Sequence, residues 1–194
     1  GELKPPYVAE GRNPHSTSLR DAAHQTAARA GALYFITWNI RRVVVWKTDD
    51  PGVALPDRVV YDEEIISQPI RTADDVRRTE VQDALTRGVK RLLAFLSSLL
   101  SGQSQPTYLP LDRIFIARLE AALYYPIDET YRSLREQIQT DRPFRLDLER
   151  WMRDDQKWVV SAATQEENLE RAARFTCYVL VNRLCFYNAL RRKF

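Results

Sequence analysis

Residues 32–46 of the chain read ALYFITWNIRRVVVW. The segments 32–38 and 42–46 are rich in β-branched and aromatic residues, which favour strands because such side chains pack well on a pleated surface. Asn39 and Ile40 lie between the two segments and leave room only for a tight turn. The stretch therefore predicts two strands that follow each other closely in the chain.

The residues before this stretch predict one more strand and a helix. Residues 7–10 read as a short strand that ends at the turn-prone sequence Gly-Arg-Asn-Pro. Residues 18–30 follow with alanines at helical spacing, with serine and threonine before them and Gly31 just after them. The N-terminal part is therefore predicted to form strand, helix, strand and strand.

The residues after this stretch become helical near residue 70. Proline- and glycine-containing segments at 49–52 and 55–57 interrupt the pattern, and residues 59–68 add one short extended piece. A long helix is then predicted to begin at Thr72 and to end before Gly102, because apolar residues recur along one side of it.

Further helices are predicted beyond residue 110, where prolines separate the periodic apolar segments. Their expected ranges are 111–124, 128–139, 146–154 and 165–192. The predicted fold class is therefore α+β, with a small α/β lobe over residues 1–70 and an all-α helical bundle over residues 71–194.

The composition is that of a globular protein. Of the 194 residues, 44% are hydrophobic and 28% are charged, unlike the polar and highly charged composition of disordered chains. No apolar run approaches the roughly 18 residues that span a bilayer, and the first residues lack the layout of a signal peptide. We therefore expect a cytoplasmic protein without a membrane partner. Cys177 and Cys185 are expected to stay unpaired, because eight residues of helix separate them by about 12 Å.

The positive residues are clustered, although the net charge is only +3. Local clusters concentrate positive potential and attract phosphate groups. We therefore interpret the clusters as contacts to the DNA backbone, without sequence readout. The candidate contact residues are Arg12, Arg41, Arg42, Arg77, Arg78, Arg87 and Lys90. The alternative interpretation is that these clusters are solvated helix faces.

Glu10 and Arg12 follow a pattern found in metal-dependent nucleases. In a Glu-x-Lys strand, the carboxylate binds Mg²⁺ and the lysine lies on the same side of the strand. Here Arg12 replaces the lysine and cannot act as a general base, because arginine does not release its proton. A second acidic ligand is also missing. Glu10, Arg12 and Gln25 of the following helix are therefore vestigial candidates, and we expect no metal site and no catalytic residues.

Three segments together resemble a PD-(D/E)xK nuclease-like module. They are YVAEGRN at 7–13, AHQTAARAGALYFITWN at 23–39 and VVVW at 43–46. Such modules are found ahead of adenine-specific DNA methyltransferases. In addition, CYVLVNRLCFYNAL at 177–190 is similar to the helix that precedes the methyltransferase domain in type I-like and type IIG-like restriction-modification proteins.

The resemblance implies the N-terminal part of a restriction or phage-defence methyltransferase, with a degenerate nuclease-like lobe and a helical connector. It implies non-specific DNA binding and domain positioning, but no cleavage. The Asn-Pro-Pro-Tyr signature of the methyltransferase core is absent from these residues. S-adenosylmethionine is therefore expected only in a downstream domain, and no cofactor is expected here.

The last predicted helix suggests a different function. Its apolar residues extend over more than one side, so we expect surface that a downstream methyltransferase domain or a partner subunit covers, or that supports self-association. A protein–protein interaction module that acts through the helical lobe is therefore the alternative to DNA binding. No zinc-ligand spacing, hydrolase motif or phosphate loop supports other classes.

Overall fold

The computed structural model describes residues 13–68, 70, 72–103 and 107–193. The chain forms two compact units, Gly1–Ala121 and Ala122–Phe194. The sequence predicted a division near residue 70, but in the structure the boundary between the two units lies some 50 residues later in the sequence. The reason is that the first long helix packs on the sheet and so belongs to the first unit. The observed class is mixed α+β, as the sequence predicted.

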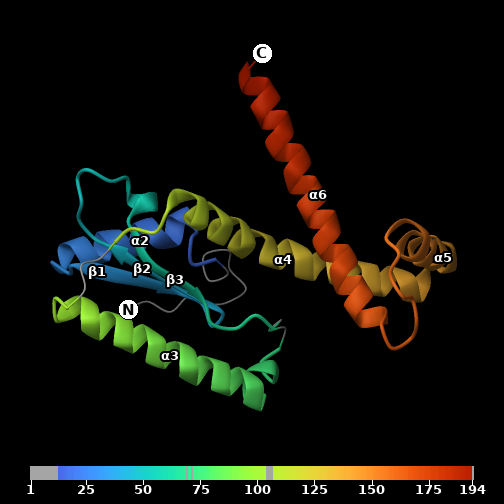
Figure 1. Ribbon diagram of the computed structural model, residues 1–194, viewed down its shortest axis with the longest axis horizontal. Coiled ribbons are helices and arrows are strands. Elements are labelled where there is room, and N and C mark those ends of the chain that lie inside the picture. Colours follow the sequence, from blue (N-terminus) through green and yellow to red (C-terminus); the bar gives the residue numbers. More distant parts are fainter. Residues whose placement is uncertain (1–12, 69, 71, 104–106, 194) are drawn as a thin grey trace. The chain divides into compact units, whose positions relative to one another are not determined.

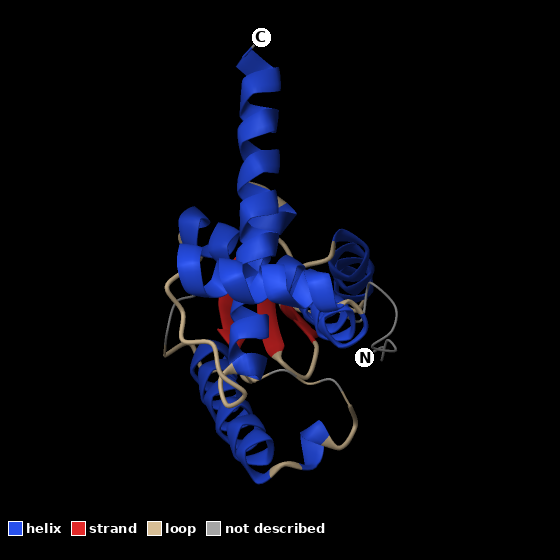
Figure 2. Ribbon diagram, turned by 90° about the vertical axis from the view of Figure 1, so that its right-hand side faces the viewer, coloured by secondary structure: helices blue, strands red, loops and turns tan. Residues whose placement is uncertain are grey.

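A three-stranded antiparallel sheet in the order β1-β2-β3 forms the centre of the first unit (Figure 2). Its strands are β1 (Tyr34–Trp38), β2 (Arg42–Lys47) and β3 (Val59–Glu64). All three confirm strands predicted from the sequence. The central strand β2 is buried from Val43 to Trp46 because both faces of the sheet are covered, which explains its continuous apolar sequence.

Helix α2 (Thr17–Arg29) covers one face of the sheet, as the alanine-rich sequence predicted. Ala27 packs there against Phe35 and Trp46, whose rings are stacked 5.9 Å apart. The buried indole N–H of Trp46 donates to the hydroxyl of Thr37 at 2.8 Å, so the polar end of this large side chain is satisfied. The strand predicted at 7–10 lies outside the described residues.

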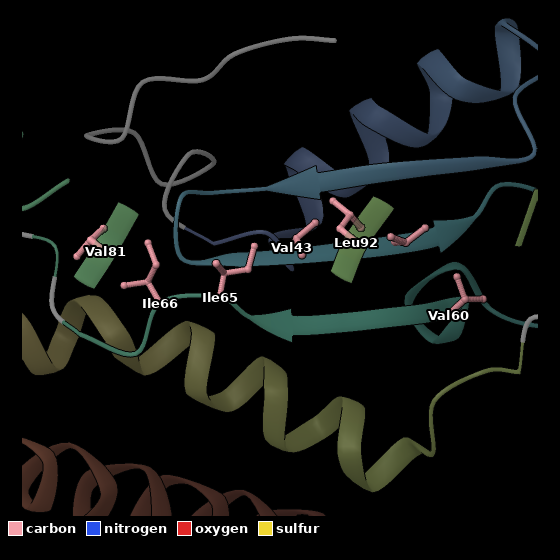
Figure 3. Close-up of a cluster of buried hydrophobic side chains, with 7 residues drawn as sticks. Val43, Val60, Ile65, Ile66, Val81 and Leu92 are labelled. Carbon is pink, nitrogen blue, oxygen red and sulfur yellow. The ribbon is translucent and has the colours of Figure 1, made fainter. Parts of the chain in front are cut away.

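Helix α3 (Thr79–Leu100) covers the opposite face of the sheet (Figure 1). Its Leu92 packs with Val43 and Val60, and Figure 3 shows these side chains gathered in one cluster. The predicted helix from Thr72 starts later, because Arg78 has extended backbone angles and the residues before it form a short 3-10 turn, η2 (Asp75–Arg77).

Helix α4 (Leu111–Thr140) is one continuous helix, although the sequence predicted two helices separated by Pro126. A proline inside a helix removes one backbone donor and usually ends or bends the helix. Here Leu123 and Tyr131, on either side of Pro126, are both buried in the second unit. Packing on both sides therefore explains why the helix continues through the proline.

The described elements of the second unit are all helical. Helix α5 (Arg142–Arg150) starts earlier than predicted, because the carboxylate of Asp141 accepts a hydrogen bond from the backbone N–H of Phe144 at 2.9 Å. A π-helical turn, η3 (Trp151–Asp155), follows it, and α6 (Gln165–Lys193) ends the chain as predicted. The core combines Tyr131, Ile138, Met152, Leu169, Ala172 and Ala173. 

Two further predictions are confirmed. Cys177 is buried and Cys185 is exposed, and both are free thiols. In the described ranges, no helix combines the length and the apolar character needed to cross a membrane.

Candidate nucleic-acid interface

Helix α3 presents Arg87 and Lys90 to solvent. The residues that face the sheet, Val81, Leu92 and Leu99, are buried, whereas Arg87 and Lys90 are both exposed. Residues three apart are neighbours on a helix surface, so the two cations lie side by side. No carboxylate of the described residues forms an ion pair with either of them. This pair of cations is therefore available to an anion from outside the chain.

The next cation along α3, Arg91, is held within the fold. Its guanidinium donates to the carboxylate of Glu63 on β3 at 2.6 Å, and the hydroxyl of Tyr61 donates to the same carboxylate. The hydrogen bond that Arg91 donates to Glu63 raises the pKa of Arg91, and burial together with Glu63 raises the pKa of the Tyr61 phenol. Arginine and tyrosine are protonated at neutral pH even without these shifts, so both groups act as donors to Glu63 there. Arg91 fastens α3 to the sheet, which sequence alone did not reveal.

Arg77 and Arg78 lie just before α3, and their side chains are 83% and 60% exposed. Each forms an ion pair with the aspartate three residues earlier: Arg77 with Asp74 at 3.2 Å, and Arg78 with Asp75. The Arg77–Asp74 pair is exposed on both sides and contributes about 0–1 kcal/mol, so a phosphate can replace its carboxylate at small cost. The carboxylate of Asp75 is only 9% exposed, so Arg78 keeps this partner while its guanidinium faces solvent. Along the helix axis, Lys90 lies roughly 18 Å from Arg78.

Arg41 is engaged within the first unit. It lies in the turn between β1 and β2, and its guanidinium contacts the carboxylate of Glu64 at 2.7 Å. Only 14% of the Arg41 side chain is exposed. Arg41, which the sequence predicted to contact DNA, therefore forms an ion pair with Glu64 at the end of β3.

Arg42 is also engaged within the first unit, and it joins β2 to α4. Its guanidinium donates to the backbone carbonyl of Ala117 at 2.6 Å and to the carboxylate of Glu120 at 3.1 Å. A carboxylate oxygen of Asp62 on β3 lies 3.5 Å from its Nε. With 11% of its side chain exposed, Arg42 is positioned to hold the sheet and the helix together.

His15 and Asp62 form a buried pair that the sequence did not indicate. Nε2 of His15 lies 2.8 Å from a carboxylate oxygen of Asp62, and the two side chains are 2% and 3% exposed. The His15 ring also meets the Trp46 ring edge-on at 5.6 Å. Because neither polar group reaches the surface, the pair fastens the residues before α2 to β3 and is not placed to act on a substrate.

The nuclease-like candidates are only partly placed by the structure. Glu10 and Arg12 lie outside the described residues, and Gln25 is exposed on α2. His24 of the same helix is satisfied, with Nε2 2.9 Å from the backbone carbonyl of Thr48. Within the described part of the chain, no three or more His, Cys, Asp or Glu side chains are grouped so as to bind a metal ion.

Comparison with protein-family models, with curated proteins and with solved structures finds no match to this chain.

Proposed function

We propose that the chain binds duplex DNA without sequence preference, as the N-terminal part of a restriction or phage-defence DNA methyltransferase. The observation that carries the proposal is the exposed pair Arg87 and Lys90 on α3, which has no carboxylate partner among the described residues. The observed succession of α2, β1 and β2 supports the resemblance to a nuclease-like module. Methyl transfer, and the binding of S-adenosylmethionine, belong in this proposal to a domain downstream.

The phosphate contacts are assigned to one surface, formed by α3 and the residues before it. Arg87 and Lys90 contribute charge that has no carboxylate partner among the described residues, and Arg77 contributes an exposed guanidinium in a replaceable ion pair. The exposed guanidinium of Arg78 adds to this charge while it keeps its pair with Asp75. A span of roughly 18 Å along this surface corresponds to several phosphates of a duplex, which carries about one charge per 1.7 Å. Arg41 and Arg42 are left out of this surface, because the fold uses their guanidinium groups.

The same surface limits the expected affinity. Glu80 and Asp83 are exposed on α3 between the two pairs of cations and repel phosphate. We therefore expect a dissociation constant of about 10⁻⁴ to 10⁻⁶ M, the range of non-specific contacts. The chain contributes position and retention on DNA in this proposal, and no cleavage.

The test is a titration of two unrelated 24-base-pair duplexes by fluorescence anisotropy between about 25 and 200 mM salt. Each neutralised phosphate adds about 0.9 to the slope of log affinity against log salt, so two to four contacts give a slope of about −2 to −4. Equal affinity for both duplexes is expected. A preference of tenfold or more for one duplex, or a slope near zero, contradicts the proposal.

A second function has its own support. Helix α6 exposes large apolar residues, including Phe186 at 67% and Tyr187 at 63%, which favours a protein–protein interaction module acting through the helical lobe. Binding through an apolar surface responds weakly to salt, whereas binding through phosphates responds steeply. Absence of DNA binding at 25 mM salt in the same titration favours this second function.

A further inference from the structure

The C-terminal half of α6 is a helix surface that the second unit does not cover. Among the residues of α6 whose burial is described, Cys177 is the last buried one, and every residue from Asn182 to Arg191 is exposed. Figures 1 and 2 both show this part of the helix extending beyond α5. Isolated helices of this length are marginal in water, so a long helix with large exposed apolar residues is suited to packing against another element.

The exposed surface continues the seam that is buried in the first half of α6. Leu169, Ala173 and Cys177 face the core of the second unit. Leu180, Leu184 and Tyr187 continue from Cys177 in steps of three, four and three residues, and they are 57%, 52% and 63% exposed. This spacing places residues on one stripe of a helix and is the pattern of helix–helix packing. The stripe Leu180, Leu184 and Tyr187 is called the distal seam below.

The charges beside the distal seam all have the same sign. From Arg171 to Lys193 the sequence contains no aspartate or glutamate. Arg183 lies three residues after Leu180 and four residues before Tyr187, so it is a direct neighbour of the distal seam on the helix surface. The remaining cations of this stretch are Arg171, Arg174, Arg191, Arg192 and Lys193.

We infer that the distal seam is a docking surface for an α-helix of a partner protein whose apolar stripe is flanked by carboxylates. Leucine and tyrosine side chains of the seam supply the apolar contact area. Arg183 supplies the complementary charge, because it borders the seam and the stretch offers no carboxylate of its own. A second copy of the chain fits less well, since two distal seams would bring arginines together without acidic partners, which is destabilising.

The experiment uses two synthetic helical peptides with one shared leucine seam, one flanked by glutamates and the other by lysines. Their affinities for the full chain are measured by fluorescence anisotropy at 100 mM salt. The glutamate peptide is expected to bind at least tenfold more tightly than the lysine peptide. Equal affinities, or no binding of the glutamate peptide, overturn the inference.

Variants of exposed residues locate the contact. Leu184→Glu is expected to weaken binding of the glutamate peptide at least tenfold. Arg183→Glu should weaken binding of the glutamate peptide and strengthen binding of the lysine peptide. The matched control is Arg174→Glu, which changes the charge equally but adjoins Ala173 off the stripe, and it should change either affinity by less than threefold. Equal effects of Arg174→Glu and Arg183→Glu contradict docking at the seam.

Other occupants of the distal seam give different results. Sedimentation velocity that shows dimers lost in Leu184→Glu, with no competition by the glutamate peptide, assigns the seam to a second copy. Binding to vesicles containing anionic lipid that is lost in Leu184→Glu, with no peptide binding, assigns it to a membrane surface. Either result overturns the inference. Unchanged thermal unfolding of the variants, followed by circular dichroism, shows that the fold is intact.

Discussion

Replacing Gly88 with alanine should destabilise the first unit, although alanine is the better helix former. Gly88 lies inside α3 at the point where this helix meets Ile65, which follows β3 and is buried. A methyl group added at Gly88 would lie 2.6 Å from Cγ2, 2.9 Å from Cγ1 and 3.1 Å from Cδ1 of Ile65. The close approach of α3 to the sheet, and with it the position of Arg87 and Lys90, therefore depends on the missing side chain.

The expected magnitude follows from two opposing effects. Ordinary carbon–carbon contacts are about 3.5–4.0 Å, so Cγ2 of Ile65 would have to move by about 1 Å. Overpacking of a core costs about 1–3 kcal/mol. Because isoleucine is branched at Cβ, its γ carbons cannot swing away freely. Alanine instead of glycine in a helix stabilises by about 1 kcal/mol. The net change in the free energy of unfolding is therefore a loss of about 1 kcal/mol.

The assay is urea unfolding, followed by circular dichroism and tryptophan fluorescence. Gly88→Ala is measured in three backgrounds: the wild-type chain, Ile65→Ala and Ile65→Val. Ile65→Ala removes the γ carbons, so in this background Gly88→Ala should become stabilising by up to about 1 kcal/mol. Ile65→Val is the matched control, because valine keeps both γ carbons and the conflict remains. Stabilisation by Gly88→Ala in the wild-type chain, or the same effect in all three backgrounds, would refute the steric explanation.

Three further outcomes are expected. Arg42→Ala should lower the free energy of unfolding by about 2 kcal/mol in urea unfolding, because it removes the charged hydrogen bonds to the carbonyl of Ala117 and the carboxylate of Glu120; a loss below about 0.5 kcal/mol argues against the network. The hydroxyl of Tyr108 holds the pKa of Asp50 below its usual range, so this pair stabilises the fold above about pH 4 and its contribution is lost as the pH falls through the lowered pKa. From pH 7 to pH 3, the free energy of unfolding should decrease less in Asp50→Asn than in wild type. Equal decreases contradict the assignment. Supercoiled plasmid should stay intact with the chain and Mg²⁺ or Mn²⁺, and nicking that Glu10→Ala abolishes contradicts the vestigial interpretation.

Local sequence patterns predicted most elements of the fold. Helix α2 and strands β1 and β2 have propensity, spacing and turn residues that agree with one another, so their positions followed from the sequence within a few residues. The extent of helix α4 did not follow from the sequence. Pro126 locally predicts a break, but burial of residues on both sides of it keeps the helix continuous. Such packing depends on residues far away in the sequence, which no local pattern contains.

The candidate interface was predictable only in part, for the same reason. The clusters containing Arg42 and Arg87 look alike as sequence, since both are positive residues near apolar segments. Their surroundings differ because Asp62 and Glu120 meet Arg42 only after folding, across 20 and 78 residues of sequence. Sequence therefore identifies cations that can bind phosphate, and the fold decides which of them are available.

Phosphate contact by the exposed face of α3 is the central claim, and a comparison of salt slopes tests it most directly. The variant Arg87→Ala/Lys90→Ala removes two cations that form no ion pair with the described residues, and the matched control Arg132→Ala/Arg135→Ala removes two exposed cations with the same spacing on α4. Anisotropy with a 24-base-pair duplex should show a slope shallower by about 1.8 for the α3 variant and an unchanged slope for the control. Equal slopes for the α3 variant and wild type, or an equal reduction of the slope in both variants, would contradict the account.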